Sequence, residues 1–427
     1  DLGNFNMKKF IATDVTDTPE KMRQMAEAQK SKRGFGMDPY FYRSHITYQK
    51  ELDSILYKSW LYAAHVSQVP NPGDFIQYEL GEDAIIISRD QDGEIQAQYN
   101  ICRHRGSRVC EEKSGNTRTF VCPYHGWVYN LDGSLRAARE MLALEDFNAA
   151  DYGLKKPQIC VFHGLIYINC NPDAAQLAPD LLAIEPAIRG YDLANAKVIE
   201  SRVYRVDANW KLALENYVEC YHCATAHRAY AKSHTLKEPY ENVKALNEAM
   251  LARAEDQTGV AGVATKVNQV FNDNPHHGGG AYTSRYALYD GYLTGSQDGQ
   301  PVAPLMGEYK GYDGGAGDYQ IGPLSSMLNY PDHCVLYRFT PRSLTETDME
   351  IVWFVRGDAV EGKDYDVDKV TWLWHRTTVE DEFIIRRNSE GVNSRFFEPG
   401  PYHPEHEETL MRFIAWYLDT LTNDIRQ

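Results

Sequence analysis

The pattern of hydrophobic and polar positions changes character along the chain. Helical spacing over residues 16–30 and 45–60 gives way to short stretches in which apolar and polar residues alternate. Asp92-Gly93 and Asp132-Gly133 lie between such stretches and are typical of tight hairpin turns. The segment from about 40 to 170 therefore predicts an all-β unit.

The second half of the chain mixes strand and helix patterns. The pattern predicts strands over 199–210, 334–339 and 348–356, and helices over 211–229, 364–390 and 405–424. Residues 272–325 are rich in Gly, Asp, Asn and Tyr and predict a long loop, which is functional in most compact proteins. The expected fold class is α+β, with a mainly antiparallel sheet.

Composition and charge exclude several classes of protein. A formal net charge of −16 over 427 residues repels phosphate backbones, so nucleic acid is not an expected partner. The longest apolar runs are far short of the roughly 18 residues of a membrane span, so no membrane partner is expected. Eight cysteines are too few for a secreted disulfide scaffold, and the N-terminus shows no signal region. We therefore expect a cytoplasmic enzyme.

Two short motifs each pair one cysteine with one histidine. They are Cys102-x-His104 and Cys122-x-x-His125. Zinc sites with two cysteines and two histidines usually pair like with like in sequence. A Rieske-type [2Fe–2S] cluster instead takes two thiolates on one iron and two imidazoles on the other, so each loop reaches both irons. The pattern favours this cluster, and a zinc-binding module is the alternative.

A second group of metal-binding residues follows in the predicted helix over 211–229. Glu219 and His222 are three residues apart and share one helical face. His222 and His227 lie about 140° apart on an ideal helix, so both reach one metal only if the helix widens or ends there. Catalytic Fe(II) takes two histidines and one carboxylate. The candidates for that carboxylate are Asp313, Asp318, Asp332, Asp381 and Glu382. We interpret Cys220 and Cys223 as small buried fillers.

Together and in this order, the two groups resemble the α subunits of Rieske non-haem iron oxygenases. The segment Asn209-Trp-Lys through His227 is similar to the family's mononuclear iron motif. Glu380-Asp381, with the later Pro399-Gly-Pro-Tyr402, resembles the segment that brings the third ligand. The resemblance implies that Asp381 joins His222 and His227 on iron, and that Asn216 and Glu219 are catalytic. In the family, the acid at the Glu219 position links a Rieske histidine of one subunit to an iron histidine of its neighbour.

The resemblance also implies an architecture and partners. A Rieske domain over 46–172 is expected to be inserted in a helix-grip catalytic domain that comprises 1–45 and 173–427. The family assembles as trimers, so a homotrimer is expected. A flavin or iron-sulfur reductase fed by NAD(P)H would supply electrons, and O2 and a small organic molecule would be the substrates.

Finer likeness points to a substrate class. Residues 215–223 and 358–367 look like glycine betaine monooxygenases and their relatives, which implies oxidative N-demethylation of a quaternary ammonium compound. Tyr282, Tyr286 and Tyr289 are then expected in an aromatic cage that holds the cation. Ring hydroxylation of an aromatic substrate by a mono- or dioxygenase is the main alternative. A Rieske electron carrier without oxygenase activity is a further one.

Overall fold

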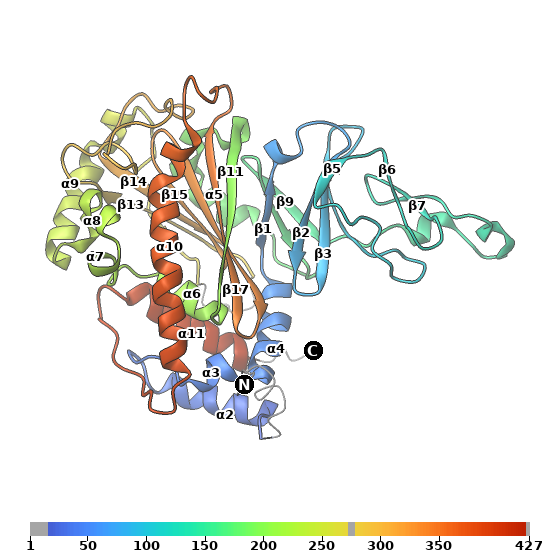
Figure 1. Cartoon of the computed structure of the whole chain (residues 1–427), viewed down its shortest axis with the longest axis horizontal. Coiled ribbons are helices and arrows are strands. Elements are labelled where there is room, and N and C mark those ends of the chain that lie inside the picture. The colour runs from blue at the N-terminus through green and yellow to red at the C-terminus, as the bar shows by residue number, and fades with distance from the viewer. Residues whose placement is uncertain (1–15, 272–277, 424–427) are drawn as a thin grey trace, which may run out of the picture.

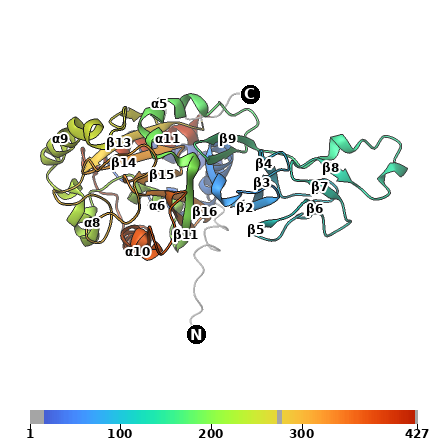
Figure 2. The same ribbon diagram turned by 90° about the horizontal axis from the view of Figure 1, so that it is seen from above.

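The protein consists of two bodies that lie side by side. The computed structural model describes residues 16–271 and 278–423, with the larger body built around one sheet and the smaller one made of short strands (Figure 1). Seen from above, the smaller body extends away from the larger one, and the strands of its far end form a slender tip (Figure 2). No helix in the described parts of the chain is long and apolar enough to cross a bilayer.

The larger body is organised by a seven-stranded antiparallel sheet. Its strands, in spatial order, are β11 (Ala196–Val206), β17 (Glu346–Arg356), β16 (Cys334–Ser343), β15 (Ser325–Asn329), β14 (Gly315–Ile321), β13 (Ala281–Ala287) and β12 (Val267–Asn268). Successive side chains of a strand point to opposite faces. Trp353 therefore packs in the core shared with the long helix α10 (Val367–Val392), whereas Phe354 packs in the core shared with α5 (Ala178–Ile188).

The smaller body is all-β, as the sequence predicts. Its sheets are β4–β3–β2–β5 (Ile95–Tyr99, Asp83–Arg89, Asp74–Leu80, Ser114–Asn116), β6–β7–β8 (Thr119–Val121, Val128–Asn130, Leu135–Ala137) and β1–β10–β9 (Leu61–His65, Leu165–Asn169, Gln158–Phe162). Phe75, Ile86, Phe120 and Tyr129 belong to one buried cluster that joins the first two sheets. Cys102 and Cys122 belong to the same cluster, which therefore supports the two Cys/His loops.

The terminal helices α2 (Pro19–Lys30), α4 (His45–Ser54) and α11 (Glu408–Thr422) agree with the sequence pattern. The short helix α3 (Tyr40–Arg43) has no counterpart in that pattern. The hydroxyl of Thr18 caps α2 by accepting a hydrogen bond from the backbone N–H of Lys21, 3.2 Å away. Two further helices, α5 and α9 (Tyr240–Thr258), have weak amphipathic patterns and were not predicted from the sequence.

The continuous helix predicted over 211–229 is wrong. The chain instead forms α6 (Trp210–Tyr217), α7 (Cys223–Ala226) and α8 (Arg228–Ser233). The carboxylate of Glu219 accepts a hydrogen bond from the backbone N–H of Tyr221, an interaction that competes with helical hydrogen bonding. The break removes the angular separation that an unbroken helix would impose on His222 and His227.

The long loop predicted over 272–325 is wrong at its two ends, whereas residues 288–314 form no helix or strand. Within it, β13 and β14 pair along seven residues, from Ala281 opposite Ile321 to Ala287 opposite Gly315. Small, hydroxyl-bearing and charged residues make up most of these strands, which therefore lack the hydrophobic period that a strand usually shows. The first part of the predicted loop, 272–277, lies outside the described residues.

One buried ion pair joins distant parts of the larger body. Lys211 of α6 and Glu51 of α4 are both 0% exposed, and the ammonium nitrogen lies 2.6 Å from a carboxylate oxygen. The Trp210 indole N–H and the Tyr417 hydroxyl also donate to Glu51, at 2.7 and 2.5 Å. Burial lowers the pKa of Lys211, and the neighbouring Glu51 carboxylate opposes that shift. The carboxylate thus ties α4, α6 and α11 together.

Replacing Lys211 by Met is expected to destabilise the catalytic body strongly. Removing one partner of a buried pair leaves the other charge uncompensated, which costs about 3–5 kcal/mol. The thermal unfolding midpoint should fall by roughly 10 °C. Arg356→Met, which breaks an exposed pair with Asp358, is the matched control and should shift the midpoint by no more than about 2 °C. Equal midpoints for the two variants would contradict the role given to the buried pair.

Candidate functional site

The two Cys/His loops have the same backbone construction. In the first, the N–H of Cys102 donates to the carbonyl of Ser107 at 2.8 Å, and the N–H of Gly106 donates to the carbonyl of Cys102 at 3.0 Å. In the second, Cys122 pairs with Trp127 and Gly126 with Cys122, at the same two distances. The glycines have φ of 82° and 73°, in the left-handed region that glycine adopts without strain.

These loops bring together the four donors expected to hold a cluster. The thiols of Cys102 and Cys122 are buried and adjacent to each other. The imidazoles of His104 and His125 are exposed, with their Nδ1 atoms 3.1 Å apart. His104 stacks on Trp127 with ring centroids 5.0 Å apart, which fixes the orientation of the ring. Two inner thiols and two outer imidazoles fit a Rieske [2Fe–2S] cluster.

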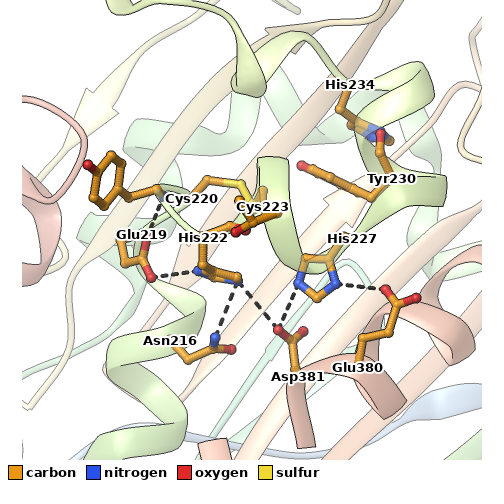
Figure 3. Close-up of a disulfide and its surroundings, with 12 residues drawn as sticks. Asn216, Glu219, Cys220, His222, Cys223, His227, Tyr230, His234, Glu380 and Asp381 are labelled. Atoms are coloured by element: carbon orange, nitrogen blue, oxygen red, sulfur yellow. Dashed lines mark hydrogen bonds and ion pairs between the residues drawn. A yellow bond between two sulfur atoms is a disulfide. The ribbon is translucent and has the colours of Figure 1, made fainter. Parts of the chain in front are cut away.

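His222, His227 and Asp381 converge on one point in the larger body (Figure 3). The Oδ1 atom of Asp381 lies 2.9 Å from Nε2 of His227 and 3.4 Å from Nε2 of His222. This buried oxygen nevertheless accepts no well-aligned hydrogen bond. Two imidazole nitrogens and one carboxylate oxygen that lie this close together fit a metal ion that takes two histidines and one carboxylate.

The outer nitrogens of both histidines face further carboxylates (Figure 3). Nδ1 of His222 lies 2.6 Å from Glu219, and Nδ1 of His227 lies 2.9 Å from Glu380. A carboxylate on Nδ1 fixes the ring and its tautomer, and leaves Nε2 free to bind a metal. The side-chain amide of Asn216 also lies 3.3 Å from Nε2 of His222.

Charge in this cluster shifts the pKa values of the imidazoles upward. Burial alone lowers the pKa of His222, but the neighbouring carboxylates of Asp381 and Glu219 raise it to about 9. Burial raises the pKa of Asp381, yet the two histidines bring it below its ordinary value. The metal-free site therefore attracts positive charge at its centre.

The structure corrects the interpretation of Cys220 and Cys223. They form a disulfide that closes a short ring around Tyr221 and His222 (Figure 3). Cys223 is buried, whereas Cys220 is partly exposed, so only one of them fills a core position. A Cys-x-x-Cys spacing is the sequence signal that indicates such a pair.

The other carboxylates proposed for the metal have different surroundings. Asp313 pairs with Arg285 at 2.5 Å, Asp332 with His333 at 2.7 Å and Glu382 with Arg386 at 3.4 Å. Asp318 lines a cavity, and among the described residues it forms no ion pair with a histidine. Sequence reasoning gave no role to Glu380, whose only signal is its position beside Asp381 on α10.

A cavity of about 510 Å³ opens beside the three converging residues. Its lining is mainly aromatic and polar, and its aromatic members are Tyr217, Tyr230, Tyr240, Tyr282, Tyr286 and Trp374. Tyr282 and Tyr286, which are expected in an aromatic cage, both line this cavity. Tyr289 is not among the lining residues, because its hydroxyl turns toward Glu238.

Comparison with known proteins identifies both bodies. Residues 59–148 match the Rieske [2Fe-2S] domain, and residues 193–423 match the catalytic domain of the ring hydroxylating alpha subunit. The glycine betaine monooxygenase oxygenase subunit of Pseudomonas aeruginosa is 33% identical over 396 residues, which are 92% of this chain and 90% of that protein.

Solved structures share the fold. A quaternary ammonium Rieske monooxygenase superposes with a TM-score of 0.70 at 18% identity, covering 94% of this chain and 98% of that one. Naphthalene 1,2-dioxygenase from Rhodococcus sp. superposes with a TM-score of 0.68 at 20% identity, covering 95% and 98%. The chain therefore belongs to the ring-hydroxylating α-subunit family of Rieske oxygenases, in which a Rieske [2Fe–2S] domain and a mononuclear iron domain receive electrons from a separate reductase.

Proposed function

We propose that this Rieske oxygenase removes an N-methyl group from a quaternary ammonium compound. The observation that carries the proposal is the cavity beside His222, His227 and Asp381, which is lined by tyrosines, a tryptophan and carboxylates. Aromatic faces and negative charge bind a fixed cation that lacks N–H donors. The relatives support it, because one is a glycine betaine monooxygenase subunit and one solved structure is a quaternary ammonium monooxygenase.

The roles of the metal-binding residues are part of the proposal. Cys102 and Cys122 would bind one iron of the cluster, and His104 and His125 the other. His222, His227 and Asp381 would bind the mononuclear iron, whose donor set suits Fe(II) and leaves positions open for O2. When bound, this iron supplies the activation of O2 that hydroxylation requires.

The chain's own residues orient and insulate the reaction. Glu219 and Glu380 accept hydrogen bonds from Nδ1 of the two histidines and hold both rings. The tyrosines that line the cavity limit water around the N-methyl group. Asn216 lies beside His222 at the edge of the cavity and restricts how that ring can turn.

The chemistry balances as a monooxygenation. The substrate, O2, two electrons and two protons give the dimethylammonium product, formaldehyde and water. One oxygen atom enters the methyl group, and the resulting hemiaminal breaks its C–N bond to release formaldehyde. The other oxygen atom leaves as water.

Assembly and electron supply complete the proposal. We place one domain boundary at residue 172 and the other between α4 and β1 rather than at residue 45, because Glu51 of α4 is buried against Lys211 of the catalytic body. We expect a homotrimer in which Glu219 links His222 to a Rieske histidine of the next subunit. The reductase would be a flavin and iron-sulfur protein that oxidises NAD(P)H, which suits a cytoplasmic location. Glu219 is suited to the link because its carboxylate lies 2.6 Å from Nδ1 of His222, while 11% of its side chain stays exposed.

Turnover with glycine betaine or carnitine is expected to release one formaldehyde for each substrate consumed. The assay uses purified oxygenase with a surrogate reductase, NADH and O2, and it compares these compounds with benzoate. Hydroxylated benzoate without formaldehyde from either amine would favour the aromatic alternative and contradict the proposal.

Asp381→Ala is expected to lose the mononuclear iron while the cluster remains. Iron should fall from about three to about two per chain, because two histidines alone bind Fe(II) weakly. Turnover should fall at least about a hundredfold, while the visible spectrum of the cluster stays unchanged. Glu382→Ala, the neighbouring acid paired with Arg386, is the control and should keep its iron. Full iron content in Asp381→Ala would exclude Asp381 as a ligand.

Glu219→Gln is expected to keep both metals yet react slowly. Gln has nearly the shape of Glu but cannot accept charge-assisted hydrogen bonds from two imidazoles. Reoxidation of the pre-reduced cluster by O2 and substrate should slow by about 10- to 100-fold in stopped-flow. Glu405→Gln, which removes an exposed acid from the same cavity, should react like wild type. Wild-type reoxidation in Glu219→Gln would mean that electrons take another path.

A further inference from the structure

Asp318 is an acid of the cavity to which the proposed function gives no role. Asp318 lies in the middle of β14, opposite Ser284 of β13 and Leu328 of β15. Because side chains alternate along strands, Asp318 shares its face of the sheet with Tyr282 and Tyr286. All of these except Ser284 line the cavity.

A second acid near the same strands has a charged partner. Arg285 of β13, on the opposite face of the sheet from Tyr282 and Tyr286, is buried with Asp313 of the loop before β14, and their charged groups lie 2.5 Å apart. In the described parts of the chain, by contrast, no lysine or arginine forms an ion pair with Asp318. Burial raises the pKa of the Asp318 carboxyl to about 7, and the nearby Tyr286 hydroxyl offsets only part of that rise.

Asp318 belongs to the same cavity as the proposed iron ligands. Burial raises the pKa of the Tyr230 phenol, and the negative charges of Asp318 and Asp381 add to that rise. The ring of Tyr230 packs against His227, with ring centroids 6.4 Å apart. The hydroxyls of Tyr282 and Tyr286 lie 3.0 Å apart. Burial raises the pKa of both, and the charge of Asp318 adds to the rise. The acid is thus surrounded by aromatic rings on the side of the cavity formed by the sheet.

The remaining charges of the cavity are mostly negative. Its acids are Glu219, Glu248, Asp318, Asp381, Glu405 and Glu408, and the lysines that line it are Lys244 and Lys266. Both lysines are exposed, so water screens them. The inner part of the cavity therefore offers tyrosine rings and the carboxylate of Asp318. Among the described residues this carboxylate forms no ion pair with a lysine or arginine, and it is not one of the proposed metal ligands.

We propose that Asp318 is the counter-charge for the quaternary ammonium group of the substrate and that it selects cations over neutral molecules of the same shape. This inference rests on the proposed function and deepens it. A trimethylammonium group has no N–H to donate, so its attraction to Asp318 is electrostatic and its methyl groups pack on Tyr282 and Tyr286. Asp318 is a binding residue for the cation and takes no part in the redox steps.

The test compares two ligands that differ in charge and hardly in shape. Glycine betaine and 3,3-dimethylbutanoate carry the same carboxylate, with trimethylammonium in the first and tert-butyl in the second. Their dissociation constants are measured by calorimetry on the iron-loaded enzyme without reductase, so that no turnover occurs. Tetramethylammonium serves as the minimal cation if the carboxylate is not accepted.

Wild type should bind glycine betaine, with its trimethylammonium group, about tenfold or more tightly than 3,3-dimethylbutanoate, with its uncharged tert-butyl group. Asp318→Asn should lower this ratio of affinities about tenfold or more, while Asp318→Glu restores part of the preference. Glu248→Gln removes an exposed acid from the same cavity and should behave like wild type. Iron content and the cluster spectrum of each variant report whether it folds.

The outcomes separate this inference from the proposed function. Wild type that binds neither glycine betaine nor tetramethylammonium contradicts the quaternary ammonium proposal itself. If Asp318→Asn binds the cation as tightly as wild type does, the role of Asp318 is contradicted and the proposed function stands. If Asp318→Asn fails to fold, the wild-type measurement still tests the inference, because equal affinity of wild type for the two ligands would exclude a counter-charge.

Discussion

The buried carboxylate of Glu51 is the point on which the catalytic body depends. It comes from α4, before the chain enters the Rieske body, and it accepts from Lys211 and Trp210 of α6 and from Tyr417 of α11. The beginning, middle and end of the catalytic body therefore meet at one charged group. Because α6 carries Asn216 and leads directly into the segment with Glu219 and His222, the same contact positions the helix from which the site is built.

The sequence was most informative where chemistry demands particular residue types. Cys102, His104, Cys122 and His125 stand out because few cofactors take one thiol and one imidazole from each of two loops. The strands of the smaller body also follow from their alternation and turn signals. Asp381 was harder, because an acid on an amphipathic helix is usually solvated. The resemblance of the surrounding segment, rather than the helical pattern, distinguished it from Asp313, Asp318 and Asp332.

The errors have physical causes. A helix over 211–229 was predicted because local propensity cannot register the hydrogen bond from Tyr221 to Glu219 or the cross-link between Cys220 and Cys223. β13 and β14 were missed because a strand that borders a cavity carries tyrosines and an acid where a core strand carries aliphatic residues. In both places the unexpected structure adjoins the proposed iron site, where functional demands override local patterns.

The carboxylates behind His222 and His227 have a consequence for metal selection. Glu219 and Glu380 hold the rings in place before any ion arrives, so metal binding requires little rearrangement of the protein. Such a preformed set of two imidazoles and one carboxylate binds Cu²⁺ and Zn²⁺ more tightly than Fe²⁺, following the Irving–Williams order. Correct loading then depends on which ions the cell supplies. Mismetallation by zinc would leave a coloured, folded protein that accepts electrons at its cluster and cannot use them.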